Sequence, residues 1–104
     1  MYSIGYVMKL KPRQYEGYKT AHDNLWPEIA LSMSDNQVNM SIFYFDNLLF
    51  LHATAPTEED WQRSRESPDL ERWAEYMSEF LEADQKGQLF FEQLPETFAF
   101  GDFQ

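Results

Sequence analysis

The chain has 104 residues, 43% hydrophobic and 17% aromatic, which is typical of one globular domain over residues 1–104 and excludes a disordered chain. A formal net charge of −10 argues against binding to nucleic acid or to an anionic membrane surface, and the absence of cysteine excludes disulfides and thiolate chemistry. The N-terminus lacks the pattern of a signal peptide, and no apolar run approaches the roughly 20 residues of a membrane span, so we expect a soluble cytoplasmic protein.

The N-terminal third of the chain predicts a strand followed by an interrupted helix. Residues 2–10 carry apolar side chains at every second position, as a strand with one buried face does. From residue 13 to about residue 34, apolar residues recur at helical spacing. Pro27 lies inside that run and cannot donate a hydrogen bond to the carbonyl of Asp23, so the helix should kink or break there.

The next segment predicts a β-hairpin. Residues 38–45 and 48–54 are rich in Ile, Phe, Tyr and Leu, most of which favour strands. Asp46 and Asn47 separate the two runs, and both residue types tolerate the positive φ angles of a tight turn.

The rest of the chain predicts a second helical region in two pieces and a closing extended segment. Thr57 can cap a helix with an acidic first turn, and Ser67 followed by proline is typical of a second helix start. The charged runs at residues 57–60 and 65–69 are interpreted as helix caps and solvated surface. Residues 88–98 form the last extended segment.

This order of elements, β-α-β-β-α-β, predicts a ferredoxin-like α+β fold of the split βαβ type. In such a fold the helices cover one face of an antiparallel sheet, and the other face meets solvent or a partner. We therefore expect a homodimer of the α+β barrel type, joined through its sheets.

His22 is the leading candidate for a catalytic residue. It lies one turn after Tyr18 and one turn before Trp26 on the apolar side of the first helical segment. A histidine in this position either fills the core or faces a cavity, and the neighbouring tyrosine, the aromatic wall and the break at Pro27 favour a cavity. Its ordinary pKa is close to neutral, so histidine can both donate and accept a proton, which typically accelerates a reaction by about 10²–10⁴-fold.

Two further residues are candidates for the same site. Trp73 either fills the core or stacks on the C–H face of a sugar. His52 lies on a strand, on the face opposite Leu49 and Leu51, and points either into the same cavity or to solvent. The sequence lacks the metal-binding spacings HEXXH and CXXC, nucleotide-binding glycine motifs and GXSXG, so we expect neither a metal nor a cofactor.

Residues 18–28 (YKTAHDNLWPE) resemble the Y-x-x-x-H-x-x-x-W-P-E signature of the L-rhamnose mutarotase family. Residues 39–43 followed by 48–50 resemble the family's central hairpin, residues 72–77 (RWAEYM) resemble its R-W-W-x-Y-M helix, and residues 94–98 (LPETF) resemble its closing strand. The resemblance covers nearly the whole chain in order. It implies a ferredoxin-like fold, a common dimeric state and interconversion of the anomers of a 6-deoxy sugar without cofactor or metal.

The resemblance also implies roles for single residues. His22 matches the family's proton donor, Tyr18 a substrate-binding tyrosine, and Trp73 the first of two tryptophans that contact sugar. His22 would then protonate the ring oxygen of a pyranose, while Tyr18 orients it or relays a proton. Trp26 and Trp73 would hold the sugar, and His52 is a candidate for the base.

Two positions depart from the family pattern. Ala74 stands where the family has its second tryptophan, and Met40 stands where it has a substrate-binding tyrosine, although a shift of one residue would place Ser41 there. These departures leave open whether the substrate is L-rhamnose, L-fucose or another 6-deoxy or uronic monosaccharide. Two other functions stay open on the residues alone: a cofactor-independent monooxygenase or decarboxylase on the same fold, and a non-catalytic carbohydrate-binding protein.

Overall fold

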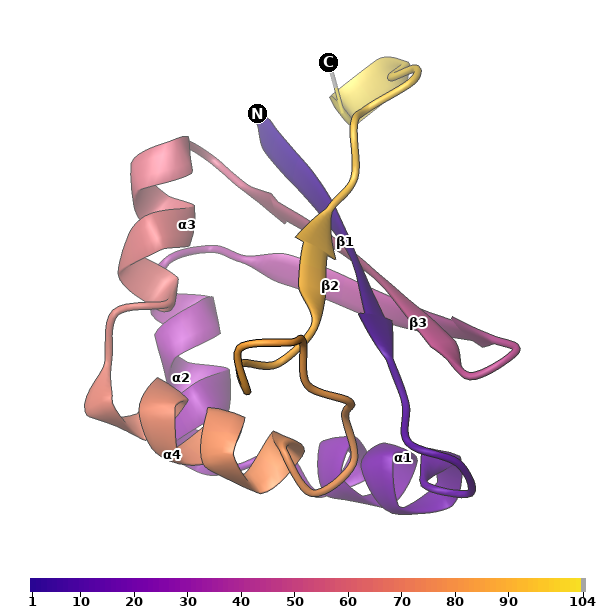
Figure 1. The fold of residues 1–104 in the computed structure, drawn as a ribbon. Coiled ribbons are helices and arrows are strands. Elements are labelled where there is room, and N and C mark those ends of the chain that lie inside the picture. The colour runs from indigo at the N-terminus through magenta and orange to yellow at the C-terminus, as the bar shows by residue number, and fades with distance from the viewer. Residues whose placement is uncertain (104) are drawn as a thin grey trace.

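A four-stranded antiparallel sheet forms one layer of the molecule, and the helices lie on one side of it (Figure 1). The computed structural model describes residues 1–103. The order of strands across the sheet is β2-β3-β1-β4. The strands are β1 (Tyr2–Lys9), β2 (Asn39–Phe45), β3 (Leu48–Ala55) and β4 (Phe91–Gln93). The helices are α1 (Tyr15–Asp23), α2 (Pro27–Asp35), α3 (Glu58–Ser64) and α4 (Pro68–Met77), and a 3₁₀ turn η1 spans Gly101–Phe103.

This arrangement confirms the expected α+β fold, with each helical region divided in two. The closing strand is much shorter than the predicted segment 88–98. The main-chain N–H of Leu94 still donates to the carbonyl of Gly5 at 2.8 Å. Pro95 follows and has no N–H to donate, so regular pairing cannot continue.

Pro27 divides the first helical region, as its chemistry requires. Helix α1 ends at Asp23, and α2 begins with Pro27 at its first position, where a missing N–H costs nothing. Trp26 has extended backbone angles of φ −60° and ψ 135° and accepts hydrogen bonds from Ile29 and Ala30 through its carbonyl. The break therefore sets α1 and α2 as separate helices and leaves residues 24–26 as a short connection.

Local turn and cap chemistry fixes the remaining joints. Asp46 and Asn47 have φ angles of 52° and 62°, as a tight hairpin turn requires. Thr57 and Asp60 form a reciprocal capping box at the start of α3, and the Ser67 side chain accepts from the N–H of Asp69 at the start of α4.

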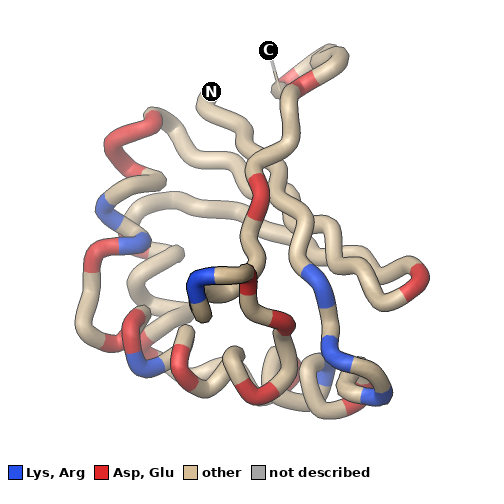
Figure 2. Tube along the Cα trace, viewed as in Figure 1, with Lys and Arg blue, Asp and Glu red and all other residues tan. Residues whose placement is uncertain are grey.

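The two faces of the sheet differ in burial. Alternate residues of β1 and β3 face the helices and form the core with apolar residues of all four helices; the buried members from the two strands are Ile4, Met8, Leu49, Leu51, Ala53 and Ala55. On the opposite face, Phe43 and Phe45 of the edge strand β2 are 66% and 71% exposed. Acidic residues are spread along the helices and loops with basic residues between them (Figure 2). No helix within residues 1–103 has the length and apolar character needed to cross a bilayer.

Candidate active site

Two adjoining cavities lie between the inner face of the sheet and the helices. Their volumes are about 330 Å³ and about 150 Å³, and we call them the larger and the smaller cavity. Ligand pockets of small-molecule sites typically measure about 300–1,000 Å³, so together they have the size of such a site. Residues of α1, α2, β2 and the connection between the two helices line both cavities: Tyr18, His22, Leu25, Met33, Met40 and Ile42.

His22 is anchored through one ring nitrogen and keeps the other nitrogen available. Its Nδ1 lies 2.9 Å from the main-chain carbonyl oxygen of Tyr18, and because a carbonyl only accepts, Nδ1 must carry the proton. Among residues 1–103, Nε2 has no hydrogen-bond partner. In the neutral ring, Nε2 is therefore an unprotonated base beside both cavities.

Burial lowers the pKa of His22 from its ordinary value. The hydrogen bond to the Tyr18 carbonyl and the charge of Asp23 act in the opposite direction, but burial is the largest cause. The imidazole is consequently neutral near pH 7. A neutral ring with a fixed tautomer can accept a proton first and return it afterwards.

Tyr18 adds a second proton-capable group to the same wall. The centroids of the Tyr18 ring and the His22 imidazole are 4.2 Å apart, and Tyr18 is only 5% exposed. Burial raises the pKa of the phenol, so it stays protonated at neutral pH. The hydroxyl has no partner within residues 1–103, yet no buried polar side-chain atom there is unsatisfied, so the oxygen reaches accessible space.

Aromatic rings from α4 and from the connection before α2 close one side of the smaller cavity. Trp73 lines this cavity and meets His22 edge-to-face, with centroids 5.3 Å apart. Trp26 lines neither cavity but packs edge-to-face behind Trp73 at 5.0 Å and stacks on Tyr76 at 5.8 Å. Trp26 thus contacts the indole that borders the cavity rather than the cavity itself.

The two positions that depart from the family pattern both border the site. Met40 of β2 lines both cavities, and its neighbour Ser41 lines the larger one. Ala74 lines the smaller cavity next to Trp73. The structure therefore brings Tyr18, Trp73 and these residues together around His22.

His52 is not part of this arrangement, which corrects its assignment to the same cavity. It lies on β3 between the buried residues Leu51 and Ala53 and therefore points to the opposite face of the sheet. There its Nε2 lies 2.9 Å from the hydroxyl oxygen of Ser3, and its ring meets Phe103 edge-to-face. The sheet separates His52 from His22, so it cannot serve as the base at this site.

Arg65, which the sequence pattern does not place at the site, follows α3 and lines the smaller cavity. The charged run at residues 65–69 predicts solvated surface, and the structure corrects this for Arg65. The available signal was its spacing of four residues from the buried Trp61, which places both on one face of a helix.

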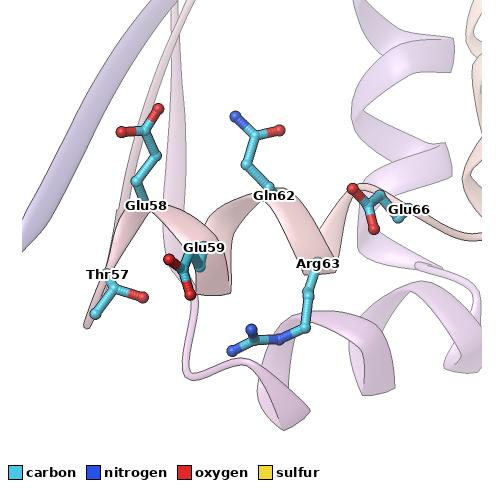
Figure 3. Close-up of a pocket in the computed structure, with 6 residues that line it drawn as sticks. All are labelled: Thr57, Glu58, Glu59, Gln62, Arg63 and Glu66. Atoms are coloured by element: carbon cyan, nitrogen blue, oxygen red, sulfur yellow. The ribbon is translucent and has the colours of Figure 1, made fainter.

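The outer face of α3 is a charged, solvent-exposed surface (Figure 3). The labelled side chains, Thr57, Glu58, Glu59, Gln62, Arg63 and Glu66, are all exposed. Thr57 belongs to the capping box, and the guanidinium of Arg63 pairs with Asp60. Within residues 1–103, no group of three His, Cys, Asp or Glu side chains is placed to hold a metal ion. The capping box and the Arg63–Asp60 ion pair are local to α3, so we assign these side chains to helix capping and solvated surface.

The fold and the site together define a ferredoxin-like α+β protein with a cavity suited to proton transfer on a small molecule. A sequence model described as L-rhamnose mutarotase matches residues 3–100. The chain is 28% identical over 96 residues to the L-rhamnose mutarotases of Escherichia coli O8 (strain IAI1) and Shigella flexneri, which covers 89% of this chain and 92% of each relative. The chain therefore belongs to the L-rhamnose mutarotase family.

A solved structure of a family member agrees with this assignment. The crystal structure of an L-rhamnose mutarotase from Formosa agariphila is similar with a TM-score of 0.81 and 25% identity, over 97% of this chain and 100% of that chain. A putative antibiotic biosynthesis monooxygenase from Nitrosomonas europaea is similar with a TM-score of 0.58 and 13% identity, over 94% of this chain and 100% of that chain. The second likeness concerns the fold alone.

Proposed function

We propose that this protein interconverts the α and β anomers of an aldopyranose, with His22 as the proton carrier. The observation that carries the proposal is the state of His22: Nδ1 is fixed by a carbonyl, and Nε2 is free beside a cavity of suitable size. Membership of the L-rhamnose mutarotase family supports the reaction class. The names of the relatives favour L-rhamnose as the neutral substrate, and L-fucose is the second neutral candidate.

The proposed steps move one proton from the anomeric hydroxyl to the ring oxygen. Neutral His22 accepts the O1 proton at Nε2 while C1 and O1 form a carbonyl and the bond between C1 and the ring oxygen breaks. The imidazolium then gives that proton to the ring oxygen, which becomes a hydroxyl. Rotation about the C1–C2 bond followed by the reverse steps closes the ring on the other face of C1, and no net proton is gained or lost.

The remaining residues hold the sugar during this cycle. The protonated Tyr18 hydroxyl can donate a hydrogen bond to a sugar oxygen in the cavity. Trp73 offers an apolar wall for the C–H groups of the ring, and Trp26 keeps the Trp73 indole in place. The rate acceleration that the protein must supply is modest, because mutarotation also proceeds in water without a catalyst, although slowly.

We also propose that two copies of this chain pair through the face of the sheet that carries no helix. Phe43 and Phe45 are exposed there, and Phe43 lies directly opposite Phe50 in the β2–β3 ladder. An exposed row of phenylalanines on a sheet face is more stable when covered. Such a pairing leaves the cavities on the other side of each sheet free for substrate.

Saturation-transfer proton NMR of anomer exchange tests the reaction. We expect the protein to accelerate exchange of L-rhamnose or L-fucose at concentrations where bovine serum albumin, as a matched control, has no effect. Sugar binding without faster exchange would contradict the proposal and indicate a carbohydrate-binding protein. Oxygen uptake with phenolic substrates, in the absence of any sugar exchange, would instead indicate the monooxygenase alternative.

A further inference from the structure

Arg65 is a cation placed against a cavity whose other lining residues carry no charge at neutral pH. Its main-chain N–H bonds the carbonyl of Gln62 at 3.0 Å, which ends α3. Its guanidinium carbon lies 5.0 Å from the ring centroid of the buried Trp61. The residue lines the smaller cavity together with His22, Trp73 and Ala74.

The guanidinium has no partner of opposite charge. The ion pairs within residues 1–103 use Lys19, Arg63 and Arg72, and no hydrogen bond there involves the side chain of Arg65. Since no buried side-chain nitrogen in that range is unsatisfied, the Arg65 nitrogens reach accessible space. Burial lowers the pKa of this group from its ordinary value, yet an arginine remains a cation at neutral pH.

The charge around the cavities is opposite to that of the whole chain. The chain carries a formal charge of −10, yet no aspartate or glutamate lines the smaller cavity. Asp23 is the acid that lines the larger cavity, and it is paired with Lys19 at 3.0 Å. Arg65 is therefore left as the unbalanced charge, in a site where a ligand can supply the missing anion.

We infer that Arg65 gives this site a preference for pyranoses that carry a carboxylate, that is, for sugar acids of the uronate class. A uronate carries its carboxylate on C5, where a 6-deoxy sugar carries a methyl group, so the same ring can occupy the same site. A planar guanidinium can bind a carboxylate through two parallel hydrogen bonds. Ala74 lines the same cavity and carries only a methyl group, so it fills less of the space beside Trp73 than the second tryptophan of the family pattern would.

This inference rests on the proposed function for the location of the site, but its test is one of binding. The ligands form two matched sets whose members differ only in the substituent on C5, which is a carboxylate, a hydroxymethyl or a methyl group. One set is galacturonate, galactose and fucose, and the other is mannuronate, mannose and rhamnose, each in the D and L series. Dissociation constants are measured at pH 7 by ligand-observed NMR for the wild type, Arg65→Met, Arg65→Lys and Arg63→Met. Arg63→Met is the matched control, because Arg63 belongs to the same segment but lies on the outer face of α3 (Figure 3).

In at least one set we expect the wild type to bind the uronate at least about 10-fold more tightly than its neutral counterparts. Arg65→Met should weaken uronate binding by roughly 10- to 100-fold, the typical loss for a charge-assisted hydrogen bond, and change neutral sugars by less than about 3-fold. Arg63→Met should leave all constants unchanged. Arg65→Lys keeps the charge without the planar fork and should give an intermediate loss.

Two results would overturn the inference. One is a wild type that binds no uronate more tightly than its neutral partners in any set. The other is an equal loss for uronates and neutral sugars in both Arg65 variants, which would assign Arg65 to packing against Trp61. A uronate bound through Arg65 without faster anomer exchange would contradict the proposed reaction and leave the binding role intact.

Discussion

The two faces of the sheet each carry one of the two histidines of the chain, and their surroundings differ. His22 lies on the helix-covered face, bonds a carbonyl of its own helix through Nδ1 and leaves Nε2 beside two cavities. His52 lies on the uncovered face, where its Nε2 is already engaged by the hydroxyl of Ser3 and its ring packs on Phe103. The free nitrogen and the adjoining cavity, rather than the residue type, therefore identify His22 as the candidate proton carrier.

The largest expected effect separates these two histidines. His22→Asn should lower kcat for anomer exchange by about 10²–10⁴-fold, because a general acid–base group typically contributes that much. His52→Asn, the matched control on the other face, should change kcat by less than about 3-fold. Rates come from NMR exchange, and unfolding curves show that both variants are folded. Equal losses in the two variants, or a folded His22 variant with wild-type turnover, would refute the assignment.

A smaller effect concerns pH. Because burial lowers the pKa of His22 and the neutral ring is the form that accepts the O1 proton, kcat/KM should be constant near neutral pH. It should fall only below the ordinary histidine value of about 6.5, and then by about 10-fold per pH unit below the lowered pKa. A fall in kcat/KM that already begins above pH 7 as the pH is lowered would show that the pKa of His22 is not lowered, or that another group titrates.

The same pKa shift links His22 to stability with a definite sign. Above pH of about 6.5 the ring is neutral in both the folded and the unfolded chain, so His22 adds no pH dependence there. Between that value and the lowered folded pKa, the unfolded chain binds a proton first, and the free energy of unfolding falls as the pH falls. His22→Asn should remove this part of the acid sensitivity in urea unfolding curves, while His52→Asn should retain it.

Local sequence chemistry predicts most of the fold. The break at Pro27, the turn at Asp46 and Asn47 and the caps at Thr57 and Ser67 each depend on only a few adjacent residues. The length of the closing strand depends instead on how many residues of β4 form main-chain hydrogen bonds with β1. That pairing joins segments far apart in the chain, so local sequence patterns do not predict it.

The candidate site is predictable where its residues share one helix. Tyr18 and His22 are four positions apart, so a helix alone brings them together. His52 and Arg65 required knowledge of tertiary placement. The alternation along β3 already places His52 opposite the buried residues, but His52 can be excluded from the site only when the helix-covered face of the sheet is known. Arg65 can be placed at the cavity only when the orientation of α3 against the sheet is known.

The smallest expected effect on turnover tests the uncovered face. Light scattering of the wild type should give twice the mass of one chain, and replacing Phe43 and Phe45 by serine should give the mass of a single chain. Because both side chains are 66% and 71% exposed in one copy, their replacement should cost little folding stability. Turnover per chain should stay within about 3-fold, since the sheet lies between these residues and His22. A wild type that is monomeric at micromolar concentration would contradict the proposed pairing, and a dimeric double variant would place the contact elsewhere on the chain.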